Sequence, residues 1–377
     1  MKVLHVYRTY FPDPPGGLQE AVRQLALATA REGVESRIFT LSPRPDPDVI
    51  ERPEGRVVRC RSWAAPASCD LGGPAAFSRF AELARWADAI HYQFPWPFAD
   101  LLHLAARPAA PAIMTYQSDI VRQRWLGRLY TPLMQRTMRD MAAVVATSPA
   151  YARTSPPLAA MADSGRLWVI PNGIDEAACA EPLAAARDID VAQRYGLVAG
   201  RYFLFIGVFR YYKGLHVLLQ AARHAGVTIA LAGGGPERAA LELQAAGMRP
   251  GQVRFLGQVS EAEKYALIRD SRALVLPSHL RSEAFGMVLV EAAMLGRPMI
   301  SCEIGTGTSF VNAQDETGLV VSPEDPIELA DAMLSLEKDE ALARRFGESA
   351  RKRYEQLFSG PALGQAYADL YRRVLKT

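Results

Sequence analysis

Two glutamates, Glu283 and Glu291, stand eight residues apart on either side of a small turn that contains glycine. The turn Ala284-Phe285-Gly286 leads into the apolar run Met287-Val288-Leu289-Val290, which predicts the start of a helix. Backbone N–H groups at such a start suit a phosphate. With a rise of about 1.5 Å per helical residue, the carboxylates could lie roughly 12 Å apart. This spacing suits a ligand with hydroxyls at both ends and a diphosphate between them, the layout of a nucleotide sugar.

Two cations, Arg210 and Lys213, follow a predicted strand at 202–206 and precede a predicted helix at 214–225. In an open α/β sheet, ligands bind at the carboxyl ends of strands. Two positive charges there would stabilise a diphosphate as it departs. Only six of the 43 basic residues are lysines, at 2, 213, 264, 338, 352 and 376, so an interior lysine suggests a role that arginine fills less well.

Three further loops carry polar or glycine residues after predicted strands. The loop Thr306-Gly307-Thr308 offers hydroxyls and N–H groups to phosphate oxygens, with a flexible loop as the alternative. The pair Gly16-Gly17 would let the backbone approach a ligand closely. Gln117 could bind a sugar hydroxyl but cannot act as a base, and Asp119 would either orient an acceptor or cap the next helix.

Strands and helices are expected to alternate along the whole chain, which predicts parallel, doubly wound sheets. Expected strands are 2–7, 34–41, 56–59, 89–92, 112–116, 143–147, 166–170, 202–206, 227–232, 253–256, 273–276, 298–302 and 318–321; expected helices are 19–31, 98–107, 122–139, 149–161, 214–225, 236–246, 260–270, 286–295, 326–336, 339–357 and 360–376. Ser260 and Glu263 form a capping box pattern at one helix start. The segment 175–199 is interpreted as a linker with a short helix between two Rossmann-like units.

The stretch SEAFGMVLVEAAMLGRPMISCEIGTGTSFVN resembles the Glu-x7-Glu region of the GT4 family of retaining glycosyltransferases. It is similar to bacterial mannosyl- and D-rhamnosyltransferases that build polysaccharides from GDP-sugars. Lys213-Gly214 also matches the family, whereas Val208 stands where the family has arginine and Gln117 where relatives have histidine. The resemblance covers nearly the whole chain and implies an α/β, GT-B fold with two Rossmann-like domains facing across a cleft. We expect an acceptor domain at 1–187, a donor domain at 188–358 and a C-terminal helix at 359–377 that crosses back to the first domain.

The resemblance also implies a role for each matching residue. Glu283 would bind the transferred sugar and Glu291 the ribose, while Arg210 and Lys213 hold the diphosphate. The other donor contacts would come from Gly286, Met287, Val288, Thr306, Gly307, Thr308 and, near the nucleobase, Val259; the acceptor would lie near Gly16, Gly17, Gln117 and Asp119.

The expected function is transfer of mannose or D-rhamnose from a GDP-sugar to a glycan or lipid-linked glycan in cell-surface polysaccharide biosynthesis. Front-face attack, in which the leaving phosphate helps to deprotonate the acceptor, would need no protein base, and no cofactor or metal is expected. Alternatives are a UDP-sugar-dependent GT4 transferase, a nucleotide-sugar 2-epimerase, and a non-catalytic nucleotide-sugar-binding subunit of an assembly complex. The pattern Asp46-Pro47-Asp48 could be named a metal motif, but a proline-rich surface loop is preferred.

The composition is that of a soluble globular enzyme, with 49% hydrophobic and 22% charged residues and a formal net charge of +3. No apolar run of about 18 residues and no signal-peptide core occur, so we expect a cytoplasmic protein. No nucleic-acid partner is expected. The stretch 120–141 places arginines beside Trp125 and leucines. An ordinary surface helix is narrowly preferred, and peripheral contact with anionic lipid on the inner face of the cell membrane is the alternative.

Overall fold

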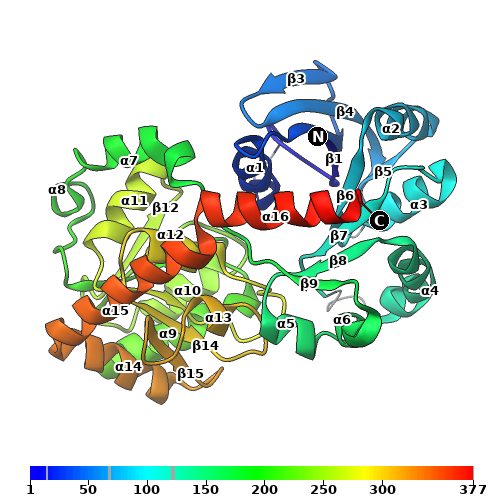
Figure 1. The fold of residues 1–377 in the computed structure, drawn as a ribbon. Coiled ribbons are helices and arrows are strands. Elements are labelled where there is room, and N and C mark those ends of the chain that lie inside the picture. The colour runs from blue at the N-terminus through cyan, green and yellow to red at the C-terminus, as the bar shows by residue number, and fades with distance from the viewer. Residues whose placement is uncertain (14–15, 67–68, 120–123, 377) are drawn as a thin grey trace. The chain divides into compact units, whose positions relative to one another are not determined.

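The computed structural model describes residues 1–13, 16–66, 69–119 and 124–376, with side chains described from Tyr130 onward in helix α4. The chain forms two compact units, drawn in Figure 1. The first contains Met1–Asp175 and Gly360–Thr377, and the second contains Glu176–Ser359. The expected division lay at 187/188. The structure groups 176–187 with the second unit because helix α7 (Ala180–Ala186) packs on helix α11 (Glu261–Asp270) there.

The first unit is built on a nine-stranded sheet with the order β3-β4-β2-β1-β6-β7-β8-β9 and with β5 paired to β4. Its strands are β1 (Lys2–Val6), β2 (Glu35–Ser42), β3 (Val49–Arg52), β4 (Gly55–Ala64), β5 (Leu71–Gly72), β6 (Ala89–Phe94), β7 (Ala112–Tyr116), β8 (Ala143–Ala146) and β9 (Leu167–Val169). All pairs are parallel except β3 and β5, which run antiparallel to β4. The order reverses between β1 and β6, so a ligand crevice is expected beyond the carboxyl ends of these two strands.

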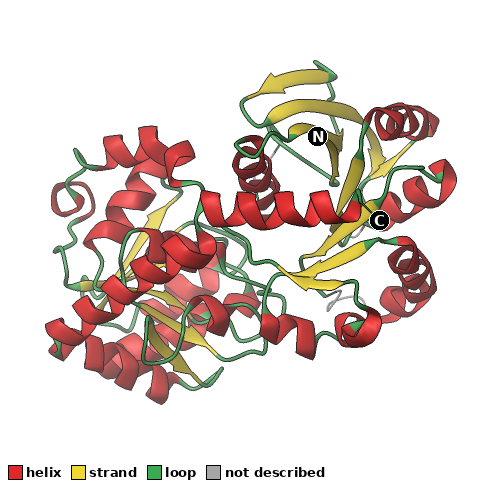
Figure 2. Cartoon of the chain, viewed as in Figure 1, coloured by secondary structure: helices red, strands yellow, loops and turns green. Residues whose placement is uncertain are grey.

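Helices cover both faces of this sheet (Figure 2). They are α1 (Gly17–Ala30), α2 (Pro74–Trp86), α3 (Pro97–Ala106), α4 (Arg124–Asp140), α5 (Pro149–Thr154), α6 (Pro156–Ala159) and, from the end of the chain, α16 (Gly360–Val374). Helices α16 and α1 pack closely because Gly364 has no side chain; a Cβ there would lie 2.5 Å from the carbonyl oxygen of Ala28. Leu363, Tyr367 and Tyr371 join Val3 and Leu25 in one apolar core. The C-terminal helix is therefore an integral part of the first unit.

The second unit has a fully parallel six-stranded sheet with the order β12-β11-β10-β13-β14-β15. Its strands are β10 (Tyr202–Ile206), β11 (Thr228–Ala232), β12 (Val253–Gly257), β13 (Ala273–Leu276), β14 (Met299–Cys302) and β15 (Gly318–Val321). Its other α-helices are α8 (Val191–Tyr195), α9 (Leu215–Ala225), α10 (Arg238–Ala245), α12 (Met287–Met294), α13 (Thr308–Val311), α14 (Pro326–Lys338) and α15 (Glu340–Arg353). The strand order reverses between β10 and β13, which marks the expected ligand crevice of this unit.

The structure differs from the expected elements at a few places. The proline-rich segment contains strand β3, because Val49 and Ile50 pair with β4 despite the flanking prolines. Helix α2 was not expected, although its buried residues Ala76, Phe80, Leu83 and Ala84 have helical spacing. The single helix expected at 149–161 is two helices, since Pro156 disfavours helical geometry at Ser155.

Candidate functional site

The loops after β10 and β13 meet at the switch point of the second sheet and bring Lys213 to Glu283. The Lys213 ammonium donates a short hydrogen bond to the Glu283 carboxylate, and Ser278 Oγ donates to the same oxygen at 3.2 Å. Both charged side chains are largely buried, with 13% and 11% of their surface exposed. Two residues 70 positions apart thus form one ion pair at the place where a doubly wound sheet binds ligands.

Gly214 explains how the two loops approach so closely. Its φ is +68°, and a Cβ at this position would lie 2.0 Å from the carbonyl oxygen of Pro277. The backbone N–H of His279 also donates to the Tyr212 carbonyl at 3.0 Å, which ties the loops together. Gly214 therefore permits the close contact between the two loops, and Lys213 forms its ion pair with Glu283 across that contact.

The charge of Lys213 is stabilised by its surroundings. Burial, the largest single effect, would lower the pKa of the ammonium, but the Glu283 carboxylate and Tyr212 together offset it and raise the pKa above its ordinary value. Arg210, exposed three residues earlier, acts on Lys213 in the opposite direction. The site therefore presents a permanently protonated lysine with a second cation nearby.

Helix α12 begins directly after Glu283 and points its free N–H groups to this crevice end of the sheet. Gly286, its N-cap, has a φ of +82°, and a Cβ there would lie 2.8 Å from Leu276 Cδ2. The N–H groups of Met287 and Val288 lie in the first turn, where the helix itself offers them no carbonyl. They are thus donors of the kind that bind phosphate oxygens.

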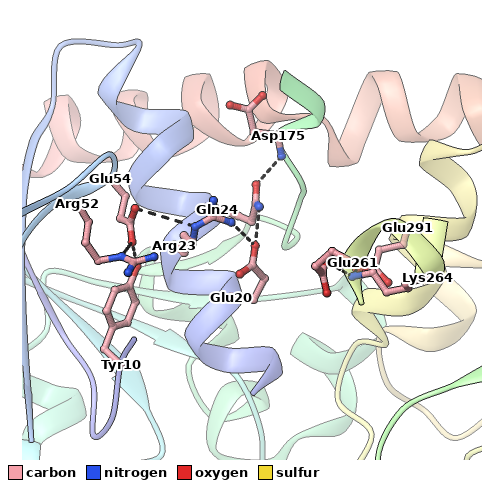
Figure 3. A network of polar contacts seen from close by, with 10 residues as sticks. All are labelled: Tyr10, Glu20, Arg23, Gln24, Arg52, Glu54, Asp175, Glu261, Lys264 and Glu291. Carbon is pink, nitrogen blue, oxygen red and sulfur yellow. Dashed lines mark hydrogen bonds and ion pairs between the residues drawn. The ribbon is translucent and has the colours of Figure 1, made fainter. Parts of the chain in front are cut away.

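Glu291 lies about one turn into the helix, and its ionic partner was not expected from the sequence. Lys264 of α11 donates to Glu291 Oε1 at 2.7 Å and to Glu261 Oε2 at 2.6 Å (Figure 3). Burial would lower the pKa of Lys264, but Glu291 and Glu261 together raise it. The rarity of lysine in this chain was the signal that could have identified Lys264.

The loop 303–308 fixes the backbone of Glu283 through a hydrogen bond. Thr306 Oγ1 donates to the Glu283 carbonyl at 2.8 Å, and Thr308 Oγ1 donates to the Cys302 carbonyl at 3.1 Å. Both threonines are buried, and the N–H of Gly307 donates to the Ala284 carbonyl at 2.8 Å. These hydroxyls donate to protein carbonyls and position the loop, and the phosphate contact expected from the sequence stays a prediction.

Val259 is half-buried and precedes α11, whose capping box of Ser260 and Glu263 is confirmed. The Ser260 backbone N–H bonded to Glu263 holds the pKa of that carboxyl down to about 2. The glycine-rich turn after β11 has a packing explanation: a Cβ on Gly233 or Gly235 would lie 2.1 Å or 2.6 Å from a carbonyl oxygen of the loop after β10.

In the first unit, Gly16 and Gly17 begin helix α1 after the switch-point strand β1, and both are exposed. A Cβ on Gly17 would meet no heavy atom within 4 Å among the described residues, so packing does not explain this glycine. Gln24 connects helix α1 to the backbone at Asp175, because its Oε1 accepts from the Asp175 N–H at 2.6 Å (Figure 3). Its Nε2 donates to Glu20 of the same helix at 2.7 Å.

Gln117 has a different environment from the one expected. It is 4% exposed; its Nε2 donates to Gln93 at 3.0 Å, and its Oε1 accepts from Asn172 Nδ2 at 2.9 Å. Its amide bonds other amides within the first unit, and the contact with a sugar hydroxyl expected from the sequence stays a prediction. Asp119 Oδ1 accepts from Ser155 at 2.7 Å and from Tyr116 at 3.2 Å.

No group of three His, Cys, Asp or Glu side chains suitable for a metal occurs among the described residues. None of the described helices has the length and apolar character needed to cross a lipid bilayer. Of the basic stretch 120–141, residues 120–123 and the side chains before Tyr130, including Trp125, lie outside what the structure describes.

The sequence matches two known protein families and is similar to characterised proteins over nearly its full length. Residues 195–353 match the family described as glycosyl transferases group 1, and residues 16–173 match the glycosyl transferase 4-like domain. The O-antigen chain mannosyltransferase C of Escherichia coli is 40% identical over 100% of both chains. D-rhamnosyltransferase WbpZ of Pseudomonas aeruginosa is 43% identical over 95% of this chain and 92% of its own.

Solved structures are similar over the whole length. Sucrose-phosphate synthase from Thermosynechococcus elongatus has a TM-score of 0.79 and 25% identity, covering 100% of this chain and 99% of its own. Anabaena Alr3699/HepE in complex with UDP has a TM-score of 0.78 and 18% identity, covering 99% of this chain and 100% of its own. The second likeness concerns the fold alone.

Proposed function

This chain belongs to the GT4-type glycosyltransferases of the GT-B fold, and from that premise we propose that it transfers mannose or D-rhamnose from a GDP-sugar, with retention, to a growing glycan. It is a hexosyltransferase of polysaccharide biosynthesis, as are the relatives it resembles over nearly their full length. The observation that carries the proposal is the Lys213–Glu283 pair beside the start of α12, at the switch point of the second sheet.

In the proposed donor complex, the diphosphate oxygens accept hydrogen bonds from the Lys213 ammonium and from the N–H groups of Met287 and Val288. Glu283, next to Lys213, accepts from hydroxyls of the hexose. Glu291, four residues into α12, accepts from the ribose. Because residues 283–286 are not helical, the separation of roughly 12 Å expected from the sequence does not apply to Glu283 and Glu291. The order of these groups along α12 supports a donor that lies parallel to the start of the helix.

Guanine is the base that Glu261 would suit best. This carboxylate is exposed by 64% on the side chain and lies beside Lys264 and Glu291. A carboxylate can only accept hydrogen bonds, and guanine offers N1–H and N2–H as adjacent donors, whereas uracil offers N3–H alone. Lys264 could donate to the guanine O6 at the same edge.

For the reaction itself, we propose front-face attack by an acceptor hydroxyl. The bond from the sugar C1 to the phosphate oxygen breaks, the bond from C1 to the acceptor oxygen forms on the same face, and the acceptor proton passes to the leaving phosphate. Lys213 and Arg210 stabilise the developing negative charge electrostatically, without a bound metal. Exclusion of water would favour transfer over hydrolysis.

A lipid-linked acceptor and contact with anionic membrane remain part of the proposal. Arg136 and Arg139 are exposed on α4 and support it. Cosedimentation with anionic vesicles, compared between wild type and Arg136→Gln/Arg139→Gln, measures it; equal sedimentation of both proteins argues against the contact.

The donor assignment is tested by thermal shift with GDP, UDP, ADP and GDP-mannose on wild type and Lys213→Ala. A ligand that binds only the folded state at a hundred times its Kd stabilises it by about 2.7 kcal/mol. We expect selective stabilisation by the guanine nucleotides, lost in Lys213→Ala and kept in Lys338→Ala, an exposed lysine of the same unit. A response to UDP alone would reject GDP, and no response to any nucleotide would reject the donor site.

A further inference from the structure

A cavity of about 730 Å³ lies at the end of the second unit's sheet where the strands begin, away from the proposed donor site. Its walls come from the segments that enter β10, β13 and β14, together with one face of α15. The donor-site residues instead follow these strands. These strands have four or five residues, and each residue rises about 3.3 Å along the strand. The cavity and the donor site are therefore roughly 15 Å apart. The volume lies within the range of small-molecule sites.

Small residues create this hollow. Gly200, Gly296, Ala199 and Gly347 line it without side chains that could fill it. A Cβ on Gly347 would lie 2.2 Å from the Gly296 carbonyl oxygen, so α15 reaches the loop at a distance that glycine alone permits.

The lining of the cavity is basic. Six of the residues that line it are cations, and two are carboxylates, Glu340 and Glu348. The cations are Arg201, Arg272, Arg297, Arg344, Arg351 and Lys352. The lining alone thus has an excess of four positive charges. Three further carboxylates, Glu176, Glu337 and Glu355, pair with these cations from outside the lining and reduce the excess to one. An anionic ligand would be drawn to this place.

Several of these guanidinium groups are incompletely paired. The Nε atoms of Arg272 and Arg297 are buried without a hydrogen-bond partner. Arg272, 10% exposed on its side chain, has its carboxylate neighbour Glu337 at 3.7 Å, and Arg297 reaches the Ser271 carbonyl at 3.4 Å. These distances exceed those of ordinary N–H···O bonds. Burial lowers the pKa of Arg297, as expected for a cation with too little compensation.

The outer wall of the cavity has two exposed arginines whose long ion-pair distances leave them able to contact a bound anion. Arg201 and Arg344 are 65% and 69% exposed, with their carboxylate partners at 3.4 Å and 3.5 Å. Arg351 differs, because Glu176 and Glu355 hold it at 2.8 Å. The planar fork of arginine matches phosphate oxygens in pairs.

We propose that this arginine-lined cavity binds a phosphate-bearing anion with at least two negative charges, at a site separate from the donor site. Arg297 and Arg272 form the inner wall, and Arg344 and Arg201 close over the phosphate from outside. The same chemistry occurs in soluble phosphate esters and in the phosphomonoester headgroup of phosphatidic acid.

Isothermal titration calorimetry with inorganic pyrophosphate tests the site on the full chain. We expect Arg297→Gln/Arg344→Gln to lose one equivalent of bound pyrophosphate that Lys213→Ala retains. Arg344→Gln alone changes an exposed side chain and should weaken that binding about tenfold by removing one charge-assisted contact. The matched control is Arg345→Gln, the next residue of α15, which lies over the Phe346 ring and does not line the cavity.

Unchanged stoichiometry in the double variant would overturn the proposal. Equal weakening by Arg345→Gln would also overturn it, because the effect would then be one of overall charge. Vesicles of phosphatidylcholine with and without phosphatidic acid identify the source. Sedimentation that requires phosphatidic acid, Arg297 and Arg344 assigns a lipid headgroup; pyrophosphate binding without sedimentation assigns a soluble phosphate.

Discussion

At the scale of single residues, two lysine–glutamate pairs organise the proposed donor site. Lys213 pairs with Glu283 and Lys264 with Glu291, all with 11–14% of the side chain exposed. Buried ion pairs contribute little net stability, because desolvation offsets their attraction. Their value here is that each carboxylate is held in one place and each lysine remains charged.

Replacement of Lys213 should mainly reduce the rate of transfer. Loss of one preorganised group that stabilises transition-state charge typically lowers kcat about 100- to 1000-fold, and we expect this for Lys213→Ala. Lys213→Arg keeps the charge but puts a wider planar group in a buried position, so recovery should be partial. Initial rates with GDP-mannose measure both. Wild-type kcat in Lys213→Ala would contradict the assignment, and Lys338→Ala serves as the control.

Replacement of Lys264 should reduce both stability and donor affinity. Lys264→Met removes the ammonium shared by Glu291 and Glu261, and breaking a buried pair costs about 3–5 kcal/mol. Lys264→Met/Glu291→Gln removes the remaining buried charge, so it should regain part of this stability without regaining donor affinity. Denaturant unfolding and nucleotide titration separate the two effects. Recovery of affinity in the double variant would show that Glu291 does not bind the donor.

At the scale of elements, glycines decide where loops and helix starts can lie. Gly214 brings the loops after β10 and β13 together, and Gly286 begins α12 with a left-handed residue against Leu276. Both glycines are part of the binding apparatus because they set the positions of Lys213 and of the N–H groups at the start of α12.

Gly286→Ala should therefore weaken donor binding as well as folding. A left-handed non-glycine residue costs about 1–3 kcal/mol, and the contact with Leu276 Cδ2 at 2.8 Å adds to it. Gly251→Ala is the matched control, since its φ of +79° imposes the same backbone strain while its nearest neighbour lies at 3.5 Å. Thermal unfolding and nucleotide titration of both variants measure the difference. Equal losses of stability and of donor affinity in the two variants would show that Gly286→Ala does not displace the start of α12.

At the scale of the whole molecule, each unit places polar residues beyond the switch point of its own sheet. The first unit also depends on the end of the chain. The Tyr371 hydroxyl of α16 lies 2.7 Å from His91 Nδ1, and Thr115 lies 2.7 Å from Nε2. This buried contact joins the C-terminal helix to strands β6 and β7.

His91 and its neighbour His5, whose ring centroid lies 5.5 Å away, should make the first unit sensitive to acid. Burial lowers the pKa of His5 from 6.5 to about 4 and that of His91 well below its ordinary value, with His5 adding to the shift of His91. The unfolded chain binds their protons below pH 6.5 and the folded unit does not. The stabilisation is therefore complete above pH 6.5 and is lost as the pH falls, by up to about 1.4 kcal/mol per pH unit for each histidine.

Denaturant unfolding between pH 6.5 and about 4 measures this slope. His5→Gln should reduce the slope, whereas His224→Gln, an exposed histidine on α9, should leave it unchanged. A slope that is the same in all three proteins would exclude the buried histidines as its cause.

The sequence by itself determined the alternation of strands and helices, the helix cap at Ser260 and the family resemblance of the stretch 276–321, because these follow from local periodicity and from residue types at short spacing. Tertiary structure decided what depends on distant segments. It paired Lys264 with Glu291 across 27 residues, directed the hydroxyls of Thr306 and Thr308 inward, and engaged Gln117 with Gln93 and Asn172. A side chain's partners depend on which strands become neighbours, and that order comes from packing of the whole sheet, which no local pattern contains.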